Sequence, residues 1–161
     1  MSIALSKLIV TALGTGYAPK APGTAGSIFA GFLLYAFNYL LLKSLGDGSL
    51  IILLNSVLII FTFFIGGYAI KKVHSVWEHD SGKIVIDEVI GVFITLVAAP
   101  LDWRYYVLGV VLFRVFDIWK PLYIRRFDNM QSDWSVMWDD VLAGIYSFIV
   151  LELIIYLDML G

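Results

Sequence analysis

Two pairs of adjacent carboxylates stand where apolar runs begin. Asp87 and Glu88 precede one run, and Asp139 and Asp140 precede the last run of the chain. A carboxylate at a helix start can stabilise the helix dipole, or it can bind a divalent cation. Capping explains one carboxylate near an exposed end, but a second one that points into the protein needs a partner such as a cation. We therefore favour metal binding, with capping as the alternative.

A third group combines positive and negative charge. Arg114, Asp117 and Lys120 are spaced three residues apart, and Pro121 follows them. On a helix this spacing puts all three side chains on one face. A ladder of ion pairs is the plain interpretation. A carboxylate for Mg²⁺ and cations for phosphate oxygens would use the same arrangement.

The glycine-rich segment 14–27 precedes another apolar run. Thr24 and Ser27 are placed to cap the first turn of the helix that it enters. Free backbone N–H groups at such a helix start attract anions. The segment lacks the Gly-Lys-Ser/Thr ending of a nucleotide-binding loop. Taken alone, it indicates a capped turn at least as strongly as a phosphate site.

The composition places these groups in a membrane protein. Apolar residues make up 60% of the 161 residues, above the roughly half that is usual in a soluble globular domain. The mean hydropathy is +0.88. The absence of cysteine excludes a disulfide framework, a zinc-thiolate site and a cysteine nucleophile. Dispersed basic residues and a net charge of −2 give no reason to expect a nucleic-acid partner. We expect one domain, residues 1–161.

The apolar runs predict an all-α membrane bundle with about five spanning helices and a short N-terminal helix. Three runs are long enough to span alone, and two shorter helices would span by including their polar flanks. The short N-terminal helix covers Ser6 to Leu13. The five expected spans are Ala25–Leu42, Leu50–Ile70, Ile84–Ala99, Trp103–Pro121 and Val141–Leu160.

Five spans put the glycine-rich segment, the two acidic pairs and Asp117 on one membrane face. This face carries eight Lys and Arg residues and the other carries two, so the positive-inside rule predicts that the acidic face is cytoplasmic. Carboxylates at membrane depth are costly and indicate function, although buried structural ion pairs are the alternative. The eight are Lys7, Lys20, Lys71, Lys72, Lys83, Lys120, Arg125 and Arg126, and the two are Lys43 and Arg104.

Four segments resemble the signature blocks of the phosphatidylglycerophosphatase A family, and they occur in the family's order: 22–27, 87–91, 113–121 and 139–144. The resemblance implies a Mg²⁺-dependent enzyme of the bacterial cytoplasmic membrane with an all-helical fold. Such an enzyme hydrolyses phosphatidylglycerophosphate, a lipid of the bilayer, to phosphatidylglycerol and phosphate. It also implies that the motif residues of this chain are Asp87, Glu88, Asp117, Lys120, Asp139 and Asp140.

Hydrolysis of a phosphate monoester needs charge neutralisation, a nucleophile in line with the leaving oxygen, and a proton for that oxygen. We expect Glu88, Asp117 and Asp140 to bind Mg²⁺. We expect Asp87 or Asp139 to activate water, although an aspartyl-phosphate intermediate is an alternative. The residues expected to bind the substrate phosphate are Thr24, Gly26, Ser27 and Lys120, of which Lys120 also counts as catalytic.

A small membrane transporter is the alternative function. Its carboxylates would bind a translocated cation and would be expected near the middle of the spans. Here they cluster at helix ends on one side, which favours chemistry at the membrane surface. The enzyme interpretation predicts that Ser27, Glu88, Asp117 and Asp140 point toward one cavity at one end of the bundle.

Overall fold

The computed structural model describes residues 1–78, 81–121 and 135–160, and within them it contains helices and no strand, which confirms the all-α prediction. A short 3₁₀ helix, Thr15–Tyr17, follows the first α-helix. The α-helices are α1 (Ile3–Val10), α2 (Pro22–Leu45), α3 (Gly48–Val73), α4 (Ile86–Thr95), α5 (Trp103–Trp119) and α7 (Ser135–Asp158). Arg125 and Arg126, which entered the charge count, lie outside the described residues.

Three helices are long and apolar enough to cross a membrane: α2, α3 and residues Met137–Asp158 of α7. They correspond to the three runs expected to span alone. The prediction of about five spans exceeds this number. The ten residues of α4 cover only about 15 Å and the 17 residues of α5 about 25 Å, whereas the hydrocarbon core is about 30 Å thick. The apolar residues after Thr95 form a turn and do not extend α4, and α5 ends at Trp119.

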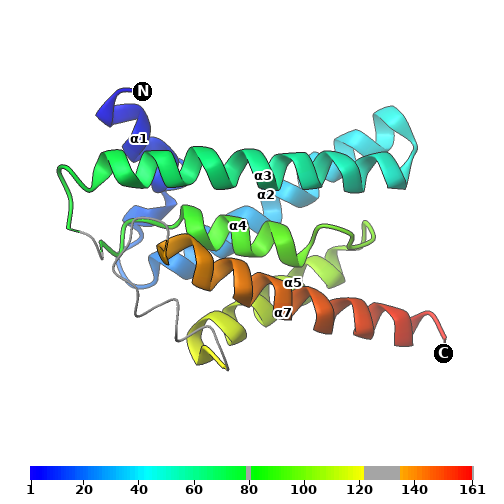
Figure 1. Ribbon diagram of the computed structural model, residues 1–161. Coiled ribbons are helices and arrows are strands. Elements are labelled where there is room, and N and C mark those ends of the chain that lie inside the picture. The colour runs from blue at the N-terminus through cyan, green and yellow to red at the C-terminus, as the bar shows by residue number, and fades with distance from the viewer. Residues whose placement is uncertain (79–80, 122–134, 161) are drawn as a thin grey trace.

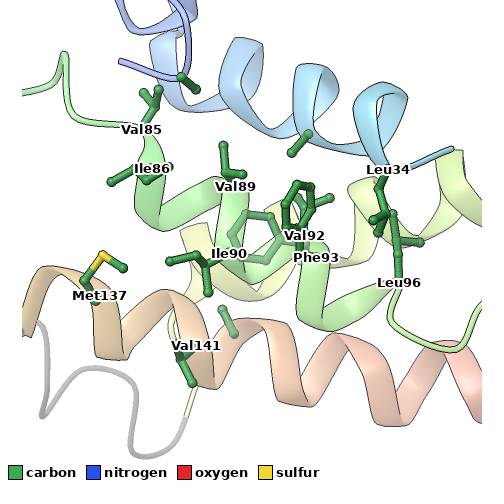
Figure 2. Close-up of a cluster of buried hydrophobic side chains, with 14 of the residues drawn as sticks. Leu34, Val85, Ile86, Val89, Ile90, Val92, Phe93, Leu96, Met137 and Val141 are labelled. Carbon is green, nitrogen blue, oxygen red and sulfur yellow. The ribbon is translucent and has the colours of Figure 1, made fainter. Parts of the chain in front are cut away.

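The short helix α4 lies inside the bundle, where it packs against α7, α2 and α3. Figure 2 shows α4 between α2 and α7, with Val89, Ile90 and Val92 among the buried side chains around it. The outer faces of the long helices remain apolar, since Phe32 is 70% exposed and Phe61 is 61% exposed. Such faces are suited to contact with lipid.

One end of the bundle collects the starts of α2, α4 and α7 and the end of α5, at the left of Figure 1. We call it the acidic end, because Asp87, Glu88, Asp117, Asp139 and Asp140 lie in these helix ends. The glycine-rich segment and these carboxylates thus lie at one end of the bundle, while the predicted count of five spans behind this arrangement exceeds what is found. The opposite end holds the α2–α3 turn and the turn between α4 and α5.

Two glycines let α4 and α7 touch backbone to backbone. A Cβ atom on Gly144 would lie 2.6 Å from the Gly91 carbonyl oxygen, and one on Gly91 would lie 2.9 Å from the Asp140 carbonyl oxygen. Both distances are too short for a real Cβ contact, so only glycine fits at this crossing. Glu88 stands one turn before Gly91, and Asp140 one turn before Gly144. The crossing therefore brings these two carboxylates close together.

The N-terminal helix α1 does not span, as predicted, and packs against α3. The chain after it fixes the start of α4, because the Val85 N–H donates to the Val10 carbonyl oxygen at 2.8 Å. A Cβ atom on Gly16 would overlap the Lys83 carbonyl oxygen, so the two segments are in close contact. The N-terminal segment thus holds the backbone directly before Asp87 and Glu88.

Candidate metal and phosphate site

Three carboxylates form a compact cluster at the acidic end. Asp87, Glu88 and Asp140 each offer an oxygen, and these oxygens lie within 4.8 Å of one another. Asp140 is buried, and Asp87 and Glu88 are half-buried. Three negative charges at this distance repel one another and have lost much of their hydration. The arrangement calls for a cation.

Capping does not account for the cluster. The N-cap residue of α4 is Val85, which makes no side-chain cap. The α7 helix already includes Ser135, so Asp139 and Asp140 lie beyond its first turn, where backbone N–H groups are bonded within the helix. The expected start of this helix at Val141 was too late, because polar residues also continue the helix at its interfacial end. Capping therefore does not account for Asp139 and Asp140, whereas Asp87 accepts the Glu88 N–H at 3.2 Å in the first turn of α4.

The cluster fits a hard divalent cation. Glu88 Oε2 is buried and has no hydrogen-bond partner in the described residues. Mg²⁺ is usually held by one or two carboxylates together with waters and substrate phosphate oxygens. A buried carboxylate oxygen with two further carboxylates beside it supplies such ligands. Asp87, Glu88 and Asp140 are the residues that would hold the ion.

Arg114 lies at the edge of the cluster. Its Nη1 atom is 2.6 Å from Asp117 Oδ2 and 3.8 Å from Glu88 Oε1. The expected common face of Arg114 and Asp117 is present, and the two form an i,i+3 ion pair. Asp117 therefore contacts Arg114 and is not part of the three-carboxylate cluster. Its predicted role as a metal ligand stays a prediction. Arg114 was not among the expected site residues, although its spacing from Asp117 and Lys120 had indicated a cation that could contact phosphate oxygens.

Lys120 joins α5 to α7. Its Nζ atom donates to Asp139 Oδ2 at 2.9 Å. The residue terminates α5 in a left-handed conformation with φ of 46°, so the helical face shared by Arg114 and Asp117 does not continue through it. The sequence placed all three on one face because it did not indicate that α5 ends at Trp119. Lys120 and Asp139 form a second charged pair beside the cluster.

The glycine-rich segment also reaches the cluster, but through its backbone. A Cβ atom on Gly23 would overlap Glu88 Oε1 and would lie 3.1 Å from Arg114 Nη1. The first turn of α2, which includes Thr24, therefore lies directly against Glu88 and Arg114. A side chain at this position would force the Glu88 carboxylate to move.

The capping prediction for Thr24 and Ser27 is wrong. The helix begins at Pro22, its N-cap is Ala21, and no side chain caps it. Both residues therefore lie inside the helix, because proline at the first position starts it earlier than expected. Ser27 is fully buried, and its hydroxyl donates to the Gly23 carbonyl oxygen at 2.8 Å. Gly26 is buried against Val85. The Ser27 hydroxyl is thus engaged within its own helix, and the phosphate contacts predicted for both residues remain a prediction.

A family model and several relatives of known name resemble this chain over most of its length. The model of the family described as Phosphatidylglycerophosphatase A matches residues 8–155. A relative from Bacteroides thetaiotaomicron, provisionally named a phosphatidylinositol-3-phosphatase, is 40% identical over 150 residues, 91% of each chain. A phosphatidylglycerophosphatase A of Haemophilus influenzae is 41% identical over 92% of this chain and 88% of its own. The Escherichia coli protein of that name is 36% identical over 87% of this chain and 77% of its own.

No solved structure matches the chain significantly. The family match covers the first turn of α2, the acidic helix starts and the end of α5, which together build the site. The match and the relatives confirm the resemblance of the four segments. This chain belongs to the phosphatidylglycerophosphatase A family.

Proposed function

We propose that this protein is a Mg²⁺-dependent phosphatase of the bacterial cytoplasmic membrane that converts phosphatidylglycerophosphate to phosphatidylglycerol and phosphate. The cluster of Asp87, Glu88 and Asp140, at one end of a bundle with three membrane-spanning helices, carries the proposal. Two relatives are named for this activity, and this chain covers most of their length. A lipid in the bilayer presents its phosphate at the membrane surface, which is where a helix-end cluster can meet it.

The three carboxylates of the cluster would hold Mg²⁺. When bound, the ion neutralises charge on the phosphate and on the transition state. Asp117 has a supporting role, because its ion pair with Arg114 fixes the guanidinium 3.8 Å from Glu88. The carboxylates thereby receive one fixed positive neighbour and keep a net negative charge for the ion.

Two cations are in place to bind the phosphate. Arg114 lies against the first turn of α2, where backbone N–H groups also favour an anion. Lys120 now donates to Asp139, and a phosphate monoester, with more than one negative charge at neutral pH, offers the same ammonium further charge-assisted acceptors. Binding of the substrate would thus draw Lys120 from Asp139 toward the phosphate.

Asp139 is then the base that we assign. The oxygen of a water forms a bond to phosphorus while the bond from phosphorus to the glycerol oxygen breaks. The proton that the water loses passes to Asp139, the leaving glycerol oxygen takes up a proton from solvent water, and Asp139 then returns its proton to the solvent. The products are phosphatidylglycerol, which remains in the bilayer, and inorganic phosphate.

Two other activities can be compared with this proposal, and only the second has specific support. The transporter alternative expects carboxylates near mid-span, whereas the cluster lies at helix ends, and the family match does not favour it. Phosphatidylinositol 3-phosphate is a second candidate substrate, because the relative from Bacteroides thetaiotaomicron carries a name for that activity. Both lipids are phosphate monoesters on a diacylglycerol-based headgroup.

Phosphate release by the purified protein in detergent tests the proposal. We expect release from phosphatidylglycerophosphate with Mg²⁺, and its loss when the metal is chelated and its return when Mg²⁺ is added back. Phosphatidylinositol 3-phosphate under the same conditions shows which headgroup is preferred. Release that chelation does not change would contradict the metal assignment, and release from neither lipid would contradict the function.

Orientation has its own test. We place the acidic end in the cytoplasm, on the charge bias described above. A cysteine introduced at Ser81, at the acidic end, should resist a membrane-impermeant thiol reagent in intact cells. A cysteine at Ser49, at the start of α3, should react. The natural chain has no cysteine, so the background is clean. The reverse labelling pattern would place the site outside. Ser132, a further labelling position on the cytoplasmic side, lies outside the described residues.

A further inference from the structure

An apolar groove of about 720 Å³ runs between the end of α5 and the outer face of α7. This volume is in the range of ligand sites. The groove opens sideways, since Trp119 is 65% exposed and Ile149 is 58% exposed, so in a membrane it faces the lipid. Its lining includes Phe116, Trp119 and Lys120 from the α5 side and Tyr146, Ile149 and Val150 from α7.

Lys120 connects this groove to the acidic end. It belongs to the groove lining, while its Nζ atom donates to Asp139 Oδ2 at 2.9 Å. Long cationic side chains place their apolar stem along an apolar surface and keep the charge at its polar edge. The groove is therefore continuous with the charged site, and Lys120 marks the point where apolar lining gives way to polar groups.

The far end of the groove lies about one bilayer leaflet away from the acidic end. Asp139 and Ile149 are ten residues apart on the same helix, which corresponds to about 15 Å. Half of a hydrocarbon core about 30 Å thick is also about 15 Å. A chain that starts at the acidic end and ends beside Ile149 would thus reach from the interface to the middle of the membrane.

We propose that this groove binds one acyl chain of the phospholipid substrate and so positions its phosphate at the acidic end. The proposal rests on the proposed lipid phosphatase function. An acyl chain in the bilayer is already in an apolar medium, so binding in the groove gains no hydrophobic free energy. The groove instead orients the chain and packs against it. Fixing the chain on one side limits the positions that the headgroup can take, which favours the reactive one.

Filling the far end of the groove tests this idea. Ile149→Trp should obstruct the groove, and Val150→Phe is a second, smaller filler. Leu153→Trp is the matched control, because Leu153 is 57% exposed on the same helix, one turn further on, and does not line the groove. Each protein is assayed with two forms of phosphatidylglycerophosphate, one with 16-carbon and one with four-carbon acyl chains.

We expect Ile149→Trp to lower kcat/KM for the long-chain lipid about tenfold, because small steric changes in an apolar pocket alter kcat/KM by about this factor. The four-carbon lipid does not reach Ile149, so its kcat/KM should stay unchanged, as should both values for Leu153→Trp. Equal losses for the two lipids would overturn the proposal, because they would indicate general damage to the site. Unchanged kinetics for both fillers with both lipids would overturn it as well.

A readout without turnover separates this proposal from the proposed function. A phosphatidylglycerophosphate analogue with a photoreactive group near the end of one acyl chain should cross-link to the peptide containing Tyr146 and Ile149. Unlabelled long-chain lipid should compete, and Ile149→Trp should reduce the yield. If the wild-type protein released no phosphate from any lipid, this pattern would still support the groove. Cross-links spread evenly over α2, α3 and α7, or a link between two protein copies at this groove, would overturn it.

Discussion

The two ends of the bundle use carboxylates in opposite ways. At the opposite end, Asp47 caps α3 by accepting the Ser49 N–H at 2.8 Å, and Asp102 caps α5 by accepting the Arg104 N–H at 2.9 Å. At the acidic end, Asp87, Glu88 and Asp140 are not N-cap residues, although Asp87 accepts the Glu88 N–H at 3.2 Å, and the three carboxylates lie against one another. The same residue types thus stabilise helix starts in one region and concentrate negative charge in the other.

The difference lies in position and burial. The ion pair of Asp102 with Arg104 is exposed, with 69% of the Arg104 side chain accessible, and such pairs contribute little. The carboxylates at the acidic end are largely withdrawn from solvent, and they outnumber the nearby cations. A helix-start carboxylate therefore indicates a site only when it is buried beside others of its kind.

Removing one charge from the cluster should have the largest effect. We expect Asp140→Asn and Glu88→Gln each to lower metal-dependent phosphate release by at least about 10³-fold, because each removes an anionic ligand and keeps the side-chain volume. Initial rates at saturating lipid across a Mg²⁺ titration measure this effect. Thermal unfolding in detergent serves as the folding control. Near-normal turnover in both variants would remove the basis for the metal assignment.

A substitution that separates α4 from α7 should have the second-largest effect. Gly144→Ala places a Cβ atom against the Gly91 backbone, which cannot move aside cheaply, so we expect a loss of about 2 kcal/mol in the free energy of unfolding together with reduced activity. Gly48→Ala at the opposite end is the matched control. It meets nothing within 4 Å and should leave stability unchanged or slightly raised. Equal melting temperatures for the two variants would mean that the crossing is looser than described.

Lys120→Met should have an intermediate effect on activity. It keeps the apolar stem and removes the ammonium that donates to Asp139. We expect KM for the lipid to rise and kcat/KM to fall between about 10-fold and 100-fold, as for the loss of one charge-assisted contact to phosphate. Steady-state kinetics with Lys120→Arg as a partial rescue measure this. A change in kcat alone, with KM constant, would instead favour a role in the chemical step.

Asp102→Asn should have the smallest effect. Asparagine caps a helix about as well as aspartate, so activity and melting temperature should not change measurably at neutral pH. Hydrogen bonds from Arg104 hold the pKa of Asp102 below its ordinary value. Any stability that the charge contributes is therefore present above the ordinary pKa and is lost as the pH falls through the lowered one. A large loss of activity in this variant would erase the distinction between the two ends.

The long helices were predictable because hydropathy is a local property. Ala25–Leu42 was expected, and Pro22–Leu45 is observed; Leu50–Ile70 was expected, and Gly48–Val73 is observed. Their ends were underestimated, since proline at the first position and polar residues at the interface extend a helix beyond its apolar run. The brevity of α4 was missed, because the apolar residues after Thr95 continue the hydropathy pattern but form a turn.

The three clustered carboxylates came from residues that the sequence had singled out, but the contacts around them were not predictable. Adjacent carboxylates at Asp87 and Asp140 marked the right helices. The pairing of Lys120 with Asp139, and the contact of Gly23 with Glu88, join segments far apart in the chain. Such contacts depend on how helices cross, which local sequence patterns do not encode.

The distribution of the site along the chain has a consequence for biosynthesis. Gly23, Glu88, Arg114 and Asp140 come from four helices, so the last of them leaves the ribosome after most of the protein has been made. Until α7 has inserted, α4 has no partner for its glycine face, and the nascent chain holds two carboxylates where the finished protein holds three. Catalytic competence therefore arises at the end of membrane insertion, and truncated chains that lack α7 should be inert in the bilayer.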